Sequence, residues 1–143
     1  MGTMRCGVLR ANQIVVHKSR REMLLLRGES ILRSYPISLG RDPVGHKLQE
    51  GDGRTPEGRY TIDRRNPKSK YHLSLHISYP EAHDVARARE AGVDPGGDIM
   101  IHGLKDGQPG PPDWTQGCIA VTNEEMDEIW SLVPDGTPIE IFP

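Results

Sequence analysis

The chain has 143 residues, which is enough for one domain with its own hydrophobic core. Its 18 Lys and Arg residues against 20 Asp and Glu residues give a formal net charge of −2, so the chain lacks the basic surface of a general nucleic-acid-binding protein. No apolar run approaches the roughly 18 residues that a transmembrane segment needs. Two cysteines do not form a disulfide framework.

Glycine and proline are unusually frequent. The chain has 16 glycines and 12 prolines, about a fifth of its residues, against an average of about 12%. This composition favours a turn-rich, mainly β domain. The first residues contain no apolar segment typical of a signal peptide. We expect residues 1–11 to be a flexible N-terminal segment in which Cys6 is an incidental thiol, and residues 12–143 to form the domain.

The expected secondary structure consists of several short strands and about two helices. Seven segments have the alternation or composition typical of strands: residues 14–18, 23–26, 30–39, 59–64, 72–79, 99–101 and 137–142. A short helix is predicted over residues 81–91, where Gly92 would end it. A second helix is predicted after Thr122, which forms a capping box with Glu125 and precedes apolar residues at helical spacing.

Two long loops separate these elements, residues 40–58 and residues 103–115. Structureless loops of this length in a small domain are usually functional. The segment Gly40–Lys47 imitates a phosphate-binding loop, but His46 stands where that loop needs a lysine and no helix follows. We therefore expect residues 40–58 to face a substrate and not to bind phosphate.

His72 and His76 suggest a zinc pair only if the segment is helical. The alternation of residues 72–79 predicts a strand, where positions four apart lie on one face but roughly 13 Å from each other. A single zinc ion cannot bridge that distance, so we expect no metal site. The two side chains then either line a cleft or face solvent.

Cys118 and His102 have the surroundings of a nucleophile and its base. His102 ends an apolar run, and Cys118 follows Gly117 at the junction of a loop with an apolar segment. A thiol nucleophile needs a nearby base, and a preceding glycine lets backbone amides approach an oxyanion. The alternative is a buried structural cysteine with an incidental histidine, and spacing by itself leaves both open.

The same residues resemble the signature of a known family. A His-Gly, a loop and then Ser/Thr-x-Gly-Cys with an apolar residue mark the L,D-transpeptidase catalytic domain of the YkuD type. This chain has Ile101-His102-Gly103 and Thr115-Gln116-Gly117-Cys118-Ile119. Residues 15–26, 35–40 and 53–58 are similar to the family's opening hairpin, third strand and "TPxG" loop, and the final helix and strand also match. The resemblance covers nearly the whole chain after residue 12.

The resemblance implies a β-sandwich-like catalytic domain that needs no cofactor. Cys118 would be the nucleophile, His102 the base and Gly103 the residue whose carbonyl orients the imidazole, with the amides of Gly117 and Cys118 as the oxyanion hole. The substrate would be the tetrapeptide stem of peptidoglycan. Its third residue would be acylated onto the thiol with release of D-Ala, and the acyl group would pass to an amine. Carbapenems are the implied inhibitors, and the periplasm or cell envelope is the implied location.

Two positions depart from the family pattern. Gln116 replaces a common histidine, and Ala120 replaces a common Arg or Asn, which leaves recognition of a stem carboxylate and the choice of acceptor open. A hydrolase on the same scaffold, acting as an L,D-carboxypeptidase or endopeptidase or releasing a wall-attached protein, is one alternative. A non-catalytic wall-binding module is another.

The residues that flank the expected site are candidates for substrate contact. These are His76, Tyr79, Trp114 and Gln116. The alternative for His76 and Gln116 is simple exposure to solvent, and the alternative for Tyr79 and Trp114 is packing in the core.

Overall fold

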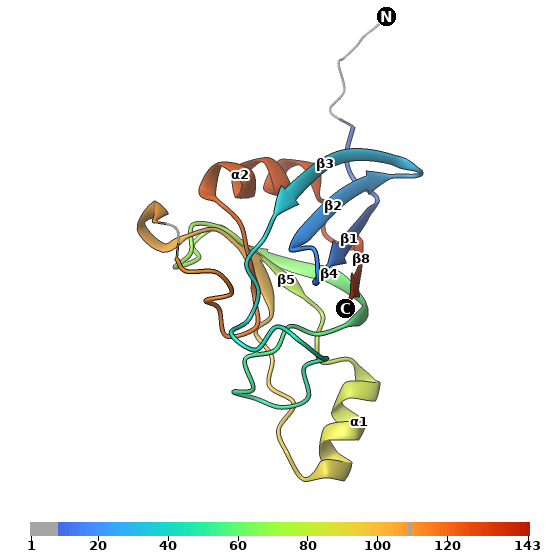
Figure 1. Cartoon of the computed structure of the whole chain (residues 1–143). Coiled ribbons are helices and arrows are strands. Elements are labelled where there is room, and N and C mark those ends of the chain that lie inside the picture. The colour runs from blue at the N-terminus through green and yellow to red at the C-terminus, as the bar shows by residue number, and fades with distance from the viewer. Residues whose placement is uncertain (1–8, 109) are drawn as a thin grey trace, which may run out of the picture.

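The computed structural model describes residues 9–108 and 110–143. The strands of this part form one eight-stranded sheet in the order β3-β2-β1-β8-β4-β5-β6-β7 (Figure 1). Their bounds are β1 Gln13–His17, β2 Glu22–Arg27, β3 Ser30–Pro36, β4 Gly58–Asn66, β5 Ser74–Ile77, β6 Met100–His102, β7 Ile119–Ala120 and β8 Pro138–Phe142. The helices are α1, Ala82–Ala91, and α2, Asn123–Leu132. The prediction of a mainly β, sandwich-like fold with two helices is confirmed.

The sheet curls because β4 belongs to both of its halves. The first residues of β4 pair with β8 and its last residues pair with β5, with a register shift between Ile62 and Arg64. An irregularity of this kind bends a strand and increases its twist. The chain that leaves β3 then reaches the far edge of the sheet, where Ser38 and Ala120 exchange two backbone hydrogen bonds of 3.0 and 2.9 Å. This closure places β7 inside the molecule.

Alternating side chains of the strands and one face of α2 build the core. Buried and less buried residues alternate along β1 and β2, as the period of a half-buried strand requires. Helix α2 contributes Met126, Ile129 and Leu132 to the same cluster. Its predicted capping box is present, with Thr122 Oγ accepting from the Glu125 amide and the Glu125 carboxylate accepting from the Thr122 amide.

The strand predicted over residues 72–79 is shorter than expected. It is reduced to β5 because His72 has a φ of 76°, in the left-handed region that interrupts a pleated strand. The His72 ring hydrogen-bonds to Asp127 on α2 at 2.5 Å. His72 and His76 therefore belong to different local structures. The helix predicted over residues 81–91 is α1, which Gly92 ends with a left-handed φ of 71°.

A buried carboxylate fastens α1 to the rest of the domain. Asp84 accepts hydrogen bonds of 2.9 Å from both Tyr60 Oη and His46 Nε2. Burial by itself would raise the pKa of Asp84, but the Glu81 amide, His46 and Tyr60 outweigh it and hold the pKa below its usual range. The carboxylate thus remains charged at neutral pH and joins α1 to the loop between β3 and β4.

The loop between β3 and β4, residues 37–57, contains no strand or helix of its own in the described structure. Two buried side chains, those of Lys18 and Thr55, hold it in place. The Lys18 ammonium donates to the carbonyls of Gly45 and Thr55 at 2.9 and 2.7 Å and to Glu57 at 3.1 Å. Thr55 Oγ1 accepts from the Gly40 amide at 3.2 Å and donates to the Gly117 carbonyl at 2.8 Å. Thr55 therefore ties the loop to the segment that carries Cys118.

Replacing Thr55 tests this connection. Thr55→Val keeps the shape but leaves the Gly40 amide and the Gly117 carbonyl without their buried partner, so we expect a loss of about 1–3 kcal/mol in the free energy of unfolding. Thr55→Ser keeps the hydroxyl and should cost only about 1 kcal/mol for the lost methyl. Urea unfolding of both variants measures the difference. Equal losses in the two variants would contradict the role of the hydroxyl.

Candidate active site

His102 ends strand β6 with its ring held in one orientation. The imidazole is buried, with the residue only 3% exposed, and Nδ1 lies 2.7 Å from the carbonyl oxygen of Gly103. A carbonyl only accepts, so Nδ1 carries the proton and Nε2 keeps its lone pair. This is the relationship that was expected between Gly103 and His102, and it leaves Nε2 as the basic atom.

Two aromatic residues cover the imidazole. Tyr71 stacks on it with ring centroids 4.5 Å apart and an interplanar angle of 22°, and Trp114 lies 5.8 Å away. Burial lowers the pKa of His102, and the hydrogen bond to Gly103 opposes this only in part. The ring is therefore neutral at pH 7. Tyr71 was not predicted, because it lies in a polar connection between strands and no spacing relates it to His102.

Cys118 directly precedes β7, the strand next to the one that His102 ends. Strands β6 and β7 pair in parallel, with Ile101 opposite Ile119 and His102 opposite Ala120. Positions two apart on a strand share a face, so Cys118 and Ala120 lie on the side of the sheet that carries His102. The parallel pairing of β6 and β7 thus places Cys118 and His102 on adjacent segments of the chain.

The Cys118 thiol is in its protonated form. Its Sγ donates to the Asp98 carbonyl oxygen at 3.3 Å. Burial raises the pKa of Cys118, with a smaller contribution in the same direction from Asp98, and the Met100 amide and the Lys47 ammonium offset this only partly. Since the thiol is protonated and His102 is neutral, Cys118 is not a preformed thiolate and would need a base to act as a nucleophile.

Gly117 shapes the turn before the thiol. Its φ is 137°, and a Cβ there would lie 2.7 Å from the Arg54 carbonyl oxygen, so only glycine fits. The Gly117 amide donates to Thr115 Oγ1 at 3.1 Å, and that hydroxyl donates to the Cys118 carbonyl at 2.7 Å. The Gly117 amide, one of the two expected oxyanion donors, therefore has an acceptor within the protein in this structure. Of the two amides expected there, that of Cys118 is the remaining candidate.

His76 and Tyr79 have different environments in the structure. His76 lies opposite Met100 across β5 and β6, and its Nδ1 is 2.6 Å from Asp63 Oδ1. It therefore borders the face that carries His102. Tyr79 is only 2% exposed, and its hydroxyl donates to the Pro95 carbonyl at 2.8 Å. The expectation of substrate contact at Tyr79 is corrected to its alternative, a core residue.

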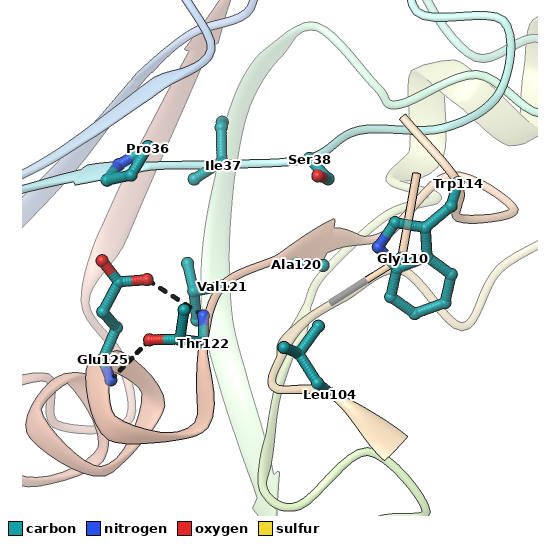
Figure 2. Close-up of a pocket in the computed structure, with 10 residues that line it drawn as sticks. All are labelled: Pro36, Ile37, Ser38, Leu104, Gly110, Trp114, Ala120, Val121, Thr122 and Glu125. Atoms are coloured by element: carbon teal, nitrogen blue, oxygen red, sulfur yellow. Dashed lines mark hydrogen bonds between the residues drawn. The ribbon is translucent and has the colours of Figure 1, made fainter. Parts of the chain in front are cut away.

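Trp114 and Gln116 lie on the loop that leads to Cys118. Trp114 is half-buried and lines a cavity of about 200 Å³ (Figure 2), and its ring centroid lies 5.8 Å from that of His102. Gln116 is exposed, and its side-chain oxygen accepts a hydrogen bond from Arg41 of the long loop. Of the four expected contacts, Trp114 is thus the one that adjoins both the imidazole and a cavity.

Other features of the described residues add no further chemistry to this site. Residues 9–108 and 110–143 hold no group of three His, Cys, Asp or Glu side chains arranged to bind a metal ion. None of the helices in these ranges is both long and apolar enough to cross a membrane. The expected incidental thiol, Cys6, lies outside the described residues.

Comparison with known sequences identifies relatives of the chain. YafK of Escherichia coli strain K12, whose name describes it as an L,D-transpeptidase, is 32% identical over 126 residues, which cover 85% of this chain and 46% of YafK. YkuD of Bacillus licheniformis, named in the same way, is 24% identical over 136 residues, 92% of this chain and 66% of that protein. The chain therefore spans about half to two thirds of the length of these relatives.

Solved structures share the fold. The helical cell shape determining protein Pgp2 of Campylobacter jejuni has a TM-score of 0.71 at 23% identity, over 90% of this chain and 46% of Pgp2. Bd1075 of Bdellovibrio bacteriovorus has a TM-score of 0.65 at 28% identity, over 94% of this chain and 48% of Bd1075. L,D-transpeptidase 1 of Mycobacterium tuberculosis has a TM-score of 0.58 at 15% identity, over 92% of this chain and 60% of that one.

A family-wide comparison covers almost the whole chain. The sequence pattern of the YkuD family, described as the L,D-transpeptidase catalytic domain, matches residues 11–141. This range contains Cys118, His102 and all the strands and helices described above, except for Phe142 at the end of β8. The chain belongs to the YkuD family of L,D-transpeptidase catalytic domains.

Proposed function

We propose that this chain is a cysteine-dependent L,D-transpeptidase that acts on peptidoglycan tetrapeptide stems in the cell envelope. The observation that carries the proposal is the fixed imidazole of His102. Its Nδ1 is committed to the Gly103 carbonyl, so the lone pair of Nε2 is free of that bond, and β6 pairs with β7, the strand that directly follows Cys118. A thiol paired with an oriented base is the arrangement used in nucleophilic acyl transfer.

The first half of the reaction forms an acyl-enzyme. The Cys118 thiol gives its proton to His102 Nε2, and the sulfur attacks the carbonyl carbon of the third residue of the stem. The Cys118 amide would donate to the developing oxyanion. When the peptide bond to D-Ala breaks, the imidazolium returns the proton to the departing amine. A thioester and free D-Ala are the products of this half.

The second half transfers the acyl group. An amine of the acceptor loses a proton to His102 Nε2 and attacks the thioester carbon. The carbon–sulfur bond breaks, and the imidazolium protonates the departing thiolate, which restores Cys118. The neutral state of both groups suits this cycle, because each half begins with a proton transfer to an unprotonated imidazole.

A hydrolase on the same scaffold is the second candidate. The Cys118 side chain is only half-buried, so water has a route to a thioester formed there. Water would then replace the amine, and the activity would be that of an L,D-carboxypeptidase or endopeptidase, or release of a wall-attached protein. Analysis of products with and without an acceptor amine separates the two candidates.

Removing the thiol tests the nucleophile. Cys118→Ala should lower D-Ala release from a purified stem tetrapeptide at least about a thousandfold, since loss of a nucleophile removes covalent catalysis. Cys6→Ala is the matched control and should retain wild-type turnover. Amino acid analysis of released D-Ala gives the rates, and retained release by Cys118→Ala would exclude the proposed mechanism.

The pH dependence tests the base. Burial holds the pKa of His102 below its usual value of 6.5, so the unprotonated base persists below pH 6.5. The acidic limb of kcat/KM should therefore have its midpoint below pH 6.5. Tyr71→Ala exposes the ring and should move the midpoint upward, whereas Tyr71→Phe keeps the stacked ring and should leave it in place. An unchanged midpoint in Tyr71→Ala would contradict this account.

A carbapenem tests the reactivity of the thiol. The strained ring of the inhibitor is an acyl donor, so Cys118 should open it and keep the fragment as a thioester. One of the similar structures is described as an avibactam carbamoyl enzyme, with a TM-score of 0.65 at 17% identity. Intact-protein and peptide mass spectrometry should place one adduct on Cys118 and none on Cys6. Absence of an adduct at Cys118 would count against the proposal.

A further inference from the structure

The cavity beside Trp114 adjoins the catalytic face. It lies between the chain that leaves β3, the end of β7 and the first turn of α2, with Trp114 as one wall (Figure 2). The same indole is 5.8 Å from the His102 ring, centroid to centroid. A group bound in the cavity is therefore separated from the imidazole by a single side chain.

Ala120 leaves the cavity open. Its Cα pairs with that of His102 across β7 and β6, and its backbone bonds to Ser38 on the opposite wall. An alanine side chain ends at Cβ, so no side chain from β7 extends into the space. The position two residues after the nucleophile thus provides room for a part of the substrate.

The lining combines apolar walls with one negative charge. Ile37, Leu104, Val121 and Trp114 form apolar walls, and Ser38 and Thr122 are uncharged. Among the lining residues that the structure describes, Glu125 is the charged one. One of its oxygens accepts from the Thr122 amide at 2.9 Å, which fixes the carboxylate and leaves its second oxygen for a ligand.

We propose that this cavity binds the alkylammonium arm of a substrate, an aliphatic chain that ends in a primary amine. Methylene groups of such an arm pack on apolar walls while the ammonium reaches the Glu125 carboxylate at one end of the cavity (Figure 2). An arm that ends in both an amine and a carboxylate fits worse, because the described lining residues include no cation to pair with the carboxylate. The inference rests on the proposed function and specifies its substrate.

Glu125→Gln is the test variant. Glutamine occupies the same capping-box position as glutamate, so the bond from the Thr122 amide and the helix start are retained while the charge is removed. Glu124→Gln is the matched control, because it removes an exposed charge from the same helical turn without touching the cavity. Thermal unfolding of both variants verifies that the helix is intact.

The probes are stem tetrapeptides with lysine, norleucine or 2,6-diaminopimelate as the third residue. Wild-type protein and Glu124→Gln should prefer the lysine peptide over the norleucine peptide by about fivefold in KM, as for a half-exposed ion pair. The diaminopimelate peptide should bind more weakly than the lysine peptide. Glu125→Gln should lose the preference for lysine over norleucine. A preference that survives in Glu125→Gln, or is absent from the wild type, overturns the inference.

Binding to Cys118→Ala separates this inference from the proposed function. Calorimetry of the lysine and norleucine peptides with Cys118→Ala, and with Cys118→Ala plus Glu125→Gln, needs no turnover. Charge-dependent binding without any D-Ala release by the wild type would support the cavity assignment and refute the transpeptidase. Turnover without charge-dependent binding would support the transpeptidase and refute the cavity assignment.

The arm can belong to the donor stem or to the acceptor amine, and kinetics distinguish these sources. A Glu125→Gln effect on the KM of the tetrapeptide assigns the arm to the donor. An effect on the KM of a lysine-bearing acceptor assigns it to the acceptor. Ala120→Leu, which fills the cavity with an apolar group, should weaken whichever of the two binds there. No change in either KM in Ala120→Leu would overturn the assignment.

Discussion

The segment that carries Cys118 is held in place by a buried hydroxyl, that of Thr55. The two long loops have little regular structure, so their buried backbone groups need partners from elsewhere. Thr55 meets this need for Gly40 and Gly117 at once, and Lys18 holds the carbonyl of Thr55 itself. Three segments that are far apart in the sequence are thereby fixed against one another. The position of Cys118 depends on this arrangement more than on the two residues of β7.

Once this segment is fixed, the electrostatics of the site follow from burial. The imidazole of His102 is covered by Tyr71 and Trp114, which disfavours its charged form, and partial burial of the Cys118 thiol disfavours the thiolate. Both groups therefore rest uncharged. The Gly103 carbonyl then selects the tautomer, and this single hydrogen bond turns a buried histidine into an oriented base.

The Ala120 position links the family scaffold to a feature of this chain. A small residue there leaves a cavity on the catalytic face, and Glu125 gives that cavity a negative charge. The same carboxylate caps α2, so its position is determined by helix formation and not only by a ligand. A residue with a structural role is in this way available for recognition, which is the basis of the alkylammonium proposal.

The sequence by itself determined the strand and helix pattern, the capping box of α2 and the pair of Cys118 and His102. These follow from local periodicity, from hydrogen bonds within one turn and from short motifs. The tertiary structure decided the rest. It ended the strand at His72, buried Tyr79, placed Tyr71 over His102, engaged the Gly117 amide and opened the cavity at Ala120. Each of these depends on contacts between segments far apart in the chain, which no local pattern encodes.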